Sequence, residues 1–311
     1  MGPGASMARL PGWNAEDHAG AYAAIRQACG ESPAFGETRT CIDAKAAGVL
    51  DEIAAKAYLE RHFRAEAVAG EGILTAYFAP AYEARRFSEG DFTAPLRPAA
   101  ADPAGAGDRS EIERGPATDA LAWLRPEDLF LLQVQGSGVL TFPDGARVRA
   151  AYAASNARPF TPIARTLIAR GLIAVSDASA DTVHDWLASH RGPEAEAVMD
   201  EDARYIFFRL EPDDGGEPRG AAGAAMIPGR SVAIDPAQHP YFELLWIDGE
   251  APTLSGARPV YQRLTVALDT GGAIQGPVRA DLYLGSGARA GEEAARVRHT
   301  LKLYRITPAG P

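Results

Sequence analysis

Residues 268–285 read LDTGGAIQGPVRADLYLG, and this stretch decides the fold. Residues 266–268 and 280–284 have the apolar character of short strands. The loop between them is rich in glycine, which permits backbone angles and close approaches that a Cβ would forbid. The pattern predicts a strand, a loop and a second strand within a compact β domain.

Two carboxylates, Asp269 and Asp281, flank this loop, and each follows an apolar residue. A carboxylate at a strand end beside a turn can be partly desolvated and still open to a ligand, which is how general acids are made. The alternative is structural, because Asp in turns readily accepts hydrogen bonds from nearby backbone amides. For a single Asp taken alone, the structural alternative is favoured.

Asp269 also begins an Asp-Thr-Gly sequence, which is typical of aspartic proteases, where two such loops bring two carboxylates together. This chain contains Asp-Thr-Gly once, so a protease would need a dimer or a second, disguised loop. At 311 residues the chain is long for the one-loop design. A dimeric aspartic protease is therefore the weaker alternative.

Other motifs accompany the loop in a fixed order. They are LTAYFAP (74–80), FLLQVQGSGVLTFPDG (130–145), NARPFTPIAR (156–165), RYIFFRL (204–210) and GRSVAIDP (229–236). With the last segment, this ordered set resembles the MltA family of membrane-bound lytic murein transglycosylases, from about Leu74 to Pro308. Six ordered blocks are far more specific than any one motif.

The resemblance implies a mainly β fold, a double-psi β-barrel with a smaller inserted β domain, a 3D-type C-terminal domain and a few helices. It implies cleavage of the β-1,4 bond between N-acetylmuramic acid and N-acetylglucosamine in peptidoglycan without water, leaving 1,6-anhydromuramic acid ends. With loop-like tracts at 98–107 and 211–220, we expect residues 1–87 and 218–311 to form a discontinuous catalytic barrel. Residues 88–217 would form the inserted domain and the other wall of the glycan groove.

The resemblance places the catalytic Asp at Asp281 and two supporting groove carboxylates at Asp269 and Asp235. It implies a substrate-binding set of Gln133, Gln135, Ser137, Tyr77, Asn156, Gly271 and Gly272. Ala76 and Ala157 stand where the family commonly has glycine, and either change could alter the backbone at the groove wall.

The chemistry can also be argued without the family. Ordinary glycosidases use two carboxylates. A transglycosylase can use one, because the C6 hydroxyl of the substrate attacks the anomeric carbon. Asp281 would protonate the departing glycosidic oxygen and then take the proton from that hydroxyl. Its pKa must then lie above roughly 3.9, raised by burial or by a neighbouring charge, for which Asp269 and Asp235 are candidates. Their alternative role is structural, in the tight turns.

Gln133, Gln135 and Ser137 alternate along the run that starts at Phe130, which predicts one polar face of a strand. Amide and hydroxyl groups on that face suit the hydroxyl and N-acetyl groups of a sugar. An ordinary half-exposed strand is the alternative. The arginines of the motifs offer cationic contacts to the wall polymer or pair with nearby carboxylates: Arg158, Arg165, Arg230 and Arg279.

Composition sets limits on function. The chain is 46% hydrophobic and 23% charged, with a net charge of −10, so it can bury a core and is a poor match for nucleic acid. No HExxH sequence or convincing ligand cluster is present, so we predict no metal and no cofactor. The expected partners are peptidoglycan glycan strands, with cell-wall synthesis proteins as further candidates. A non-catalytic carbohydrate-binding module is the main functional alternative.

The N-terminal region adds three expectations. A helix is predicted from Asn14, as its cap, to about Cys29, and a second helical region at 43–63. Cys29 and Cys41 would form a disulfide in an oxidising periplasm or remain thiols in the cytosol. The resemblance implies the periplasm, with outer-membrane association in the native precursor, although the first residues show no signal-peptide pattern. Further along, helices are predicted at 181–189 and 291–300.

Overall fold

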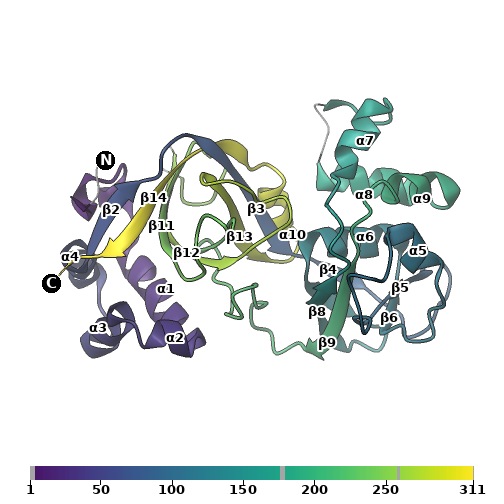
Figure 1. Ribbon diagram of the computed structural model, residues 1–311, viewed down its shortest axis with the longest axis horizontal. Coiled ribbons are helices and arrows are strands. Elements are labelled where there is room, and N and C mark those ends of the chain that lie inside the picture. The colour runs from purple at the N-terminus through teal and green to yellow at the C-terminus, as the bar shows by residue number, and fades with distance from the viewer. Residues whose placement is uncertain (1–3, 176–178, 258–259, 311) are drawn as a thin grey trace. The chain divides into compact units, whose positions relative to one another are not determined.

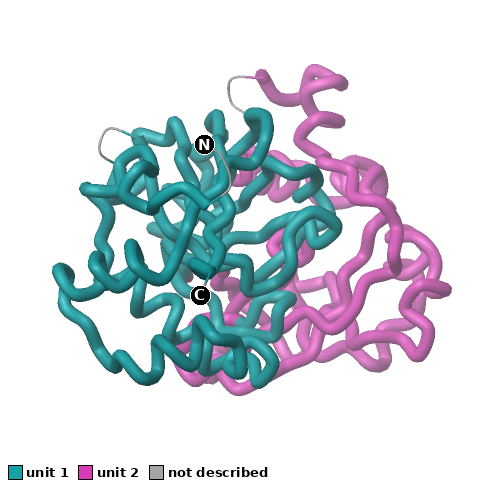
Figure 2. The backbone as a smooth tube through the Cα atoms, turned by 60° about the vertical axis from the view of Figure 1, so that its left-hand side comes forward, with its two compact units in different colours: residues 1–78, 219–285, 289–311 teal, residues 79–218, 286–288 magenta. Residues whose placement is uncertain are grey.

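The computed structural model describes residues 4–175, 179–257 and 260–310. The chain divides into two compact units, shown in Figure 2. Unit 1 consists of residues 1–78, 219–285 and 289–311, and unit 2 of residues 79–218 and 286–288. The main boundaries between the units lie at 78/79 and 218/219. The boundaries expected from the sequence are 87/88 and 217/218.

Unit 1 is built on an eight-stranded sheet with the order β1-β2-β14-β11-β12-β10-β13-β3 (Figure 1). Its strands are β1 (Ala5–Ser6), β2 (Phe63–Ala67), β3 (Gly72–Ala79), β10 (Ser231–Ala233), β11 (Leu244–Gly249), β12 (Tyr261–Asp269), β13 (Arg279–Ser286) and β14 (Arg298–Pro308). Because β14 pairs with β11 along one part and with β3 along another, the six strands from β14 to β3 form a closed barrel. The predicted fold class is confirmed.

The barrel encloses an apolar core. Leu245 and Ile247 from β11, Val232 from β10 and Leu282 from β13 are fully buried in one cluster. Residues two apart on a strand face the same way, so alternate residues of each strand point inward. Burial of this kind contributes roughly 1.5–3 kcal/mol for each large aliphatic side chain. This core therefore fixes which residues of β10, β12 and β13 point outward.

Helices cover the N-terminal part of unit 1. They are α1 (His18–Glu31), α2 (Pro33–Gly36), α3 (Arg39–Ala47) and α4 (Glu52–His62). Asp17 caps α1 by accepting a hydrogen bond from the Gly20 amide. The predicted cap, Asn14, is wrong: it lies in the preceding 3-10 helix Trp13–Ala15, and its side chain accepts from Lys56 Nζ at 2.7 Å. The second helical region is two helices, α3 and α4, separated by the turn at Gly48.

A disulfide joins Cys29 at the end of α1 to Cys41 in α3, with a Cα–Cα distance of 5.4 Å. The sequence left this bond open. It fixes α3 against α1.

Glu16 anchors the N-terminal segment to the barrel. Its side chain is fully buried and accepts hydrogen bonds from Arg230 Nη1 at 3.1 Å, from Arg263 Nη1 at 3.2 Å and from the Leu264 amide at 2.7 Å. Of the two roles considered for Arg230, the structure shows pairing with carboxylates, because its guanidinium contacts Glu16 and Asp17.

Unit 2 contains a four-stranded sheet of order β4-β7-β8-β9 and the two-stranded sheet β5-β6. These strands are β4 (Ala81–Glu83), β5 (Ala94–Leu96), β6 (Ala122–Leu124), β7 (Gly138–Thr141), β8 (Arg147–Ser155) and β9 (Ile206–Pro212). Its helices are α5 (Arg109–Arg114), α6 (Pro126–Gln135), α7 (Ile163–Ala169), α8 (Ala180–Ser189) and α9 (Pro193–Met199). The helix predicted at 181–189 is present as α8.

The predicted strand carrying Gln133, Gln135 and Ser137 is wrong. Both glutamines lie in α6, and Ser137 follows the helix end. Pro126 occupies the first turn with two acidic residues after it, and Gly136 ends the helix with φ of 83°. These are strong helix start and stop signals, and they outweigh a short alternating pattern. The three side chains therefore do not share a strand face.

The last predicted helix, 291–300, is also partly wrong. Helix α10 spans Ala288–Ala294, and the backbone of β14 begins at Arg298. Arg298, His299 and Thr300 pair with Thr75, Leu74 and Ile73 of β3. Residues 298–300, which the charge pattern predicts to end a helix, thus belong to the strand that closes the barrel.

We expect Glu16→Ala to lower the free energy of unfolding by about 3–5 kcal/mol, because it removes the buried anion of Arg263, which is partly buried, and leaves the buried Arg230 with the largely exposed Asp17 as its one remaining carboxylate among the described residues. Urea unfolding measures the change. Arg39→Ala is the matched control, since Arg39 is largely exposed and pairs with Asp43 only at the surface. Equal midpoints for Glu16→Ala and wild type would contradict the anchoring role.

Candidate active site

Asp269 and Asp281 are brought to either side of one residue of the barrel. Ala233 at the end of β10 pairs with Asp269 of β12 and with Asp281 of β13. Adjacent strands are about 4.8 Å apart, so the two Cα atoms are separated by roughly 10 Å. Residues opposite each other on neighbouring strands share a face of the sheet, which places both carboxylates on the same face.

The Asp281 carboxylate is partly buried and has one hydrogen-bond partner among the described residues. The Thr75 hydroxyl of β3 donates to its Oδ1. Burial raises the pKa of Asp281 above its ordinary value, and the nearby charge of Asp269 adds to this rise, while the Thr75 hydrogen bond and Arg279 oppose it. The result is a carboxyl group with a raised pKa and an Oδ2 that forms no hydrogen bond within the described chain.

Asp269 has both carboxylate oxygens engaged. Tyr77 of β3 donates its hydroxyl to Oδ2 at 2.6 Å, and the Ala221 amide donates to Oδ1 at 2.9 Å. Burial raises the pKa of Asp269, and these two hydrogen bonds oppose that rise. Tyr77 therefore lies beside Asp269, and its hydroxyl holds that carboxylate.

Asp235 has a structural position. Its Oδ2 accepts from the Gly276 amide at 2.7 Å, and its Oδ1 accepts from the Ala237 amide at 3.0 Å. These hydrogen bonds lower the pKa of Asp235. Asp235 is not among the charges that shift the pKa of Asp281. The contacts therefore favour the structural alternative, in which Asp235 ties the end of β10 to the glycine loop.

The loop between β12 and β13 contains Gly271, Gly272 and Gly276. Gly276 adopts a φ of 100°, a conformation that favours glycine, while it donates to Asp235. The Gly271 carbonyl accepts from the Ile274 amide at 2.9 Å, and the Gly272 carbonyl accepts from Gln275 Nε2 at 3.3 Å. The loop is thus a hydrogen-bonded turn that leads directly into Asp281's strand.

Within unit 2, the side chains of Gln133 and Asn156 are used in the protein's own hydrogen bonds. Gln133 Oε1 accepts from Arg109, and its Nε2 donates to the Ile206 carbonyl. Asn156 donates to the Gly107 and Ala203 carbonyls and accepts from the Tyr205 amide. Both side chains are buried. These contacts make the two residues part of the internal framework of unit 2.

Gln135 and Ser137 differ from them. Gln135 Oε1 is buried without a hydrogen-bond partner among the described residues, and Ser137 is partly exposed. Nearby in the sequence, Ala157 adopts a φ of 55°, a left-handed conformation that favours glycine. The backbone at Ala157 thus adopts a conformation that glycine, the residue common at this position in the family, takes without strain.

Sequence reasoning missed Thr75, the direct partner of Asp281. A signal was available, because Thr75 stands two residues before Tyr77 on the same strand and so faces the same side of the sheet. For Arg279 the sequence leaves open a contact to the wall polymer or pairing with a nearby carboxylate. Arg279 Nη2 donates to Thr75 Oγ1 at 2.8 Å, which connects it to Asp281 through the hydroxyl.

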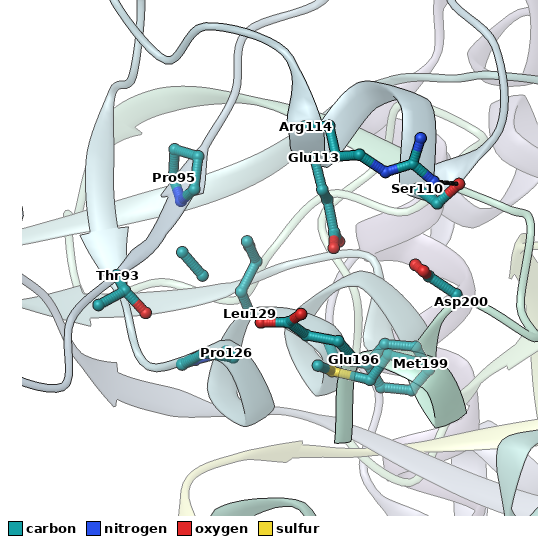
Figure 3. A pocket seen from close by; sticks show the side chains of 12 residues that line it. Thr93, Pro95, Ser110, Glu113, Arg114, Pro126, Leu129, Glu196, Met199 and Asp200 are labelled. Atoms are coloured by element: carbon teal, nitrogen blue, oxygen red, sulfur yellow. Dashed lines mark hydrogen bonds between the residues drawn. The ribbon is translucent and has the colours of Figure 1, made fainter. Parts of the chain in front are cut away.

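A pocket of about 260 Å³ lies in unit 2 (Figure 3). Its lining includes Glu113, Glu196 and Asp200, whose carboxyl groups lie around a common space, together with Arg114. Burial raises the pKa of Glu113 and of Asp200. None of the residues predicted for the site lines this pocket.

Neither a metal-binding cluster nor a membrane-spanning helix occurs among the described residues. No group of three or more His, Cys, Asp or Glu side chains in them is arranged to hold a metal ion. No described helix combines the length and the apolar character needed to cross a membrane.

Comparison with known proteins gives matches along most of the chain. One family model, the MltA specific insert domain, matches residues 73–209, and a second, the 3D domain, matches residues 230–307. Membrane-bound lytic murein transglycosylase A of Vibrio cholerae is 31% identical over 255 residues, covering 76% of this chain and 66% of the relative. The Escherichia coli K12 protein of the same name is 31% identical over 243 residues, covering 76% and 65%. The chain thus spans about two thirds of the length of these relatives.

Solved structures agree with these matches. A membrane-bound lytic murein transglycosylase from Agrobacterium tumefaciens is 29% identical with a TM-score of 0.85, covering 98% of this chain and 97% of that one. E. coli MltA with bound chitohexaose is 26% identical with a TM-score of 0.78, covering 100% and 92%. The domain models, the curated relatives and the solved structures point the same way, and the chain belongs to the MltA family of lytic murein transglycosylases.

Proposed function

We propose that this chain is a lytic transglycosylase. It cleaves the β-1,4 bond between N-acetylmuramic acid and N-acetylglucosamine in peptidoglycan and forms a 1,6-anhydromuramic acid end. The observation that carries the proposal is Asp281: a partly buried carboxyl with a raised pKa, a fixed Oδ1 and an Oδ2 that forms no hydrogen bond within the described chain. The relatives named lytic murein transglycosylase and the chitohexaose complex of E. coli MltA support the same substrate class.

The state of the other carboxylates supports a single-acid mechanism. A hydrolase needs a second carboxylate that is free to activate water or to attack the sugar. Both oxygens of Asp269 accept hydrogen bonds from Tyr77 and Ala221, and those of Asp235 from backbone amides. Neither is free for that task, so the acceptor of the glycosyl group is a hydroxyl of the substrate.

The steps follow from this arrangement. Protonated Asp281 gives its proton to the glycosidic oxygen as the bond to the anomeric carbon breaks. The C6 hydroxyl of the same muramic acid then attacks that carbon. Asp281, now a carboxylate, takes the hydroxyl proton, which restores the acid and closes the anhydro ring. Asp269, with a charge on the same face, favours the protonated form of Asp281 at the start.

The expected setting is the periplasm, where glycan strands of the wall are the partner and the disulfide between Cys29 and Cys41 is stable. Gln135, Ser137, Gly271 and Gly272 remain proposed substrate contacts. Gln133 and Asn156 are set aside, because their polar groups are used internally.

We expect Asp281→Asn to reduce release of anhydromuropeptides from purified peptidoglycan by about 10²–10⁴-fold, because the amide cannot donate an acidic proton. Mass spectrometry of the soluble products measures this. Asp185→Asn is the matched control, since Asp185 is largely exposed on α8 of unit 2. Full activity in a folded Asp281→Asn variant would exclude Asp281 as the acid, and sacculus binding without soluble sugar from wild type would identify a binding module.

The pH profile should respond to Asp269. Activity needs protonated Asp281, so it falls as pH rises through the pKa of Asp281. Asp269→Asn removes a charge that raises this pKa, and we expect the alkaline limb of kcat/KM to move to lower pH. The Asp185→Asn profile should overlay the wild-type profile. An alkaline limb that stays in place in Asp269→Asn would show that Asp269 does not tune the acid.

The raised pKa of Asp281 should also make the thermal stability of the protein depend on pH. Folding raises the pKa of Asp281 above the ordinary 3.8. The stabilisation that this difference contributes to the folded state is therefore fully present below pH 3.8 and is lost as pH rises through the folded pKa. We therefore expect Asp281→Asn to unfold at a higher temperature than wild type at pH 7, with the difference shrinking at pH 4. Thermal melts at the two pH values test this, and a constant difference would contradict it.

A further inference from the structure

The Arg279 guanidinium and the Thr75 hydroxyl form a chain of hydrogen bonds that ends at the Asp281 carboxyl. Thr75 of β3 donates its hydrogen bond to Asp281 Oδ1, and Arg279 Nη2 donates to the same Thr75 oxygen at 2.8 Å. Neither residue is needed by the steps above, since both lie on the Oδ1 side of the carboxyl. The number of hydrogens that each group can donate decides which of them donates and which accepts.

Arg279 is held in place by the backbone. Its Nη1 donates to the Ala280 carbonyl at 2.6 Å and to the Ile73 carbonyl at 3.3 Å, one on β13 and one on β3. A guanidinium group carries only donors. The Nη2 that faces Thr75 therefore always presents a hydrogen to it, and the Thr75 oxygen must accept.

A threonine hydroxyl has one hydrogen to give. One lone pair of Thr75 is taken by Arg279, and the hydrogen bond to Asp281 Oδ1 is the one that the Thr75 hydroxyl donates within the described chain, so we place this hydrogen on Oδ1. Oδ1 is then an acceptor whether Asp281 is charged or neutral. When Asp281 is neutral, its own proton must sit on Oδ2.

We propose that Thr75 and Arg279 are positioning residues that keep the proton of the Asp281 acid on Oδ2, the oxygen left open by the protein. The inference rests on the proposed function for its consequence in catalysis. The placement of the proton itself follows from the hydrogen bonds alone. The acid thus has two requirements: its pKa must be raised, and its proton must be on Oδ2.

The other groups around Asp281 do not replace this pair. Asp269 from β12 acts on it through charge, and Tyr77 from β3 directs its hydroxyl to Asp269. Tyr283 lies on β13 with its ring 5.3 Å from that of Tyr77, and Arg298 of β14 acts electrostatically on Arg279. Thr75 is the one hydrogen-bond donor to Asp281 that the described chain supplies.

The test compares Thr75→Val, which keeps the branched shape and removes the hydroxyl, with Thr75→Ser, which keeps the hydroxyl. Loss of the donor destabilises the charged form of Asp281, so its pKa rises in Thr75→Val and the alkaline limb of the rate profile moves to higher pH. We expect kcat to fall about tenfold with KM nearly unchanged, because about one hydrogen bond is lost and the proton is shared between the two oxygens. Thr75→Ser should restore both values. Arg279→Met should act in the same direction as Thr75→Val.

A second readout does not depend on activity. The Asp281 carboxyl can be titrated by ¹³C NMR in aspartate-labelled protein and assigned by its absence in Asp281→Asn. A higher titration midpoint in Thr75→Val, with Thr75→Ser like wild type, supports the proposal. An unchanged midpoint in folded Thr75→Val, or an equal loss of kcat in Thr75→Ser, overturns it. Failure of wild type to release anhydro sugar would sink the proposed function, while the titration would still decide the role of Thr75.

Discussion

The site depends on the pairing of Ala233 with two strands at once. Because β10 lies between β12 and β13, Asp269 and Asp281 are held on one face of the sheet, one strand to each side of Ala233. The next strand after β13 in the sheet is β3, and this neighbour brings Thr75 and Tyr77 to the same carboxylates. A sheet that separated between β13 and β3 would lose both hydroxyl donors together, so the surroundings of Asp281 depend on this strand pairing.

The polar groups at and near Asp281 have different roles. Burial and the charge of Asp269 raise the pKa of Asp281, and the Thr75 hydrogen bond limits that rise. Tyr77 and the Ala221 amide occupy Asp269, which leaves it as a fixed charge and not as a second catalyst. Asp235 serves the loop, since its hydrogen bonds to Gly276 and Ala237 hold the turn that leads into Asp281's strand. Three carboxylates that look alike in the sequence thus have three different surroundings.

Sequence alone predicts the β class and the two short strands around the glycine loop, because apolar runs and glycine turns are local signals, while the catalytic role of Asp281 comes from the family resemblance and stays a proposal. Sequence alone did not find Thr75, whose partner is 206 positions away along the chain. The Gln133–Ser137 segment was assigned to a strand because alternation over a few residues cannot be separated from a helix without its caps, Pro126 and Gly136. Arg298–Thr300 was assigned to a helix for a similar reason: its pairing partner, β3, is remote in sequence.

We propose that Asp281 works without a second carboxylate, so that water never becomes the acceptor. Digestion of purified peptidoglycan in H₂¹⁸O, followed by mass spectrometry of the new glycan ends, tests this most directly. If Asp281 acts alone, we expect anhydro ends that carry no heavy oxygen. Ends that carry ¹⁸O at the anomeric carbon from the earliest time points would contradict it, because a carboxylate other than Asp281 would then have activated water.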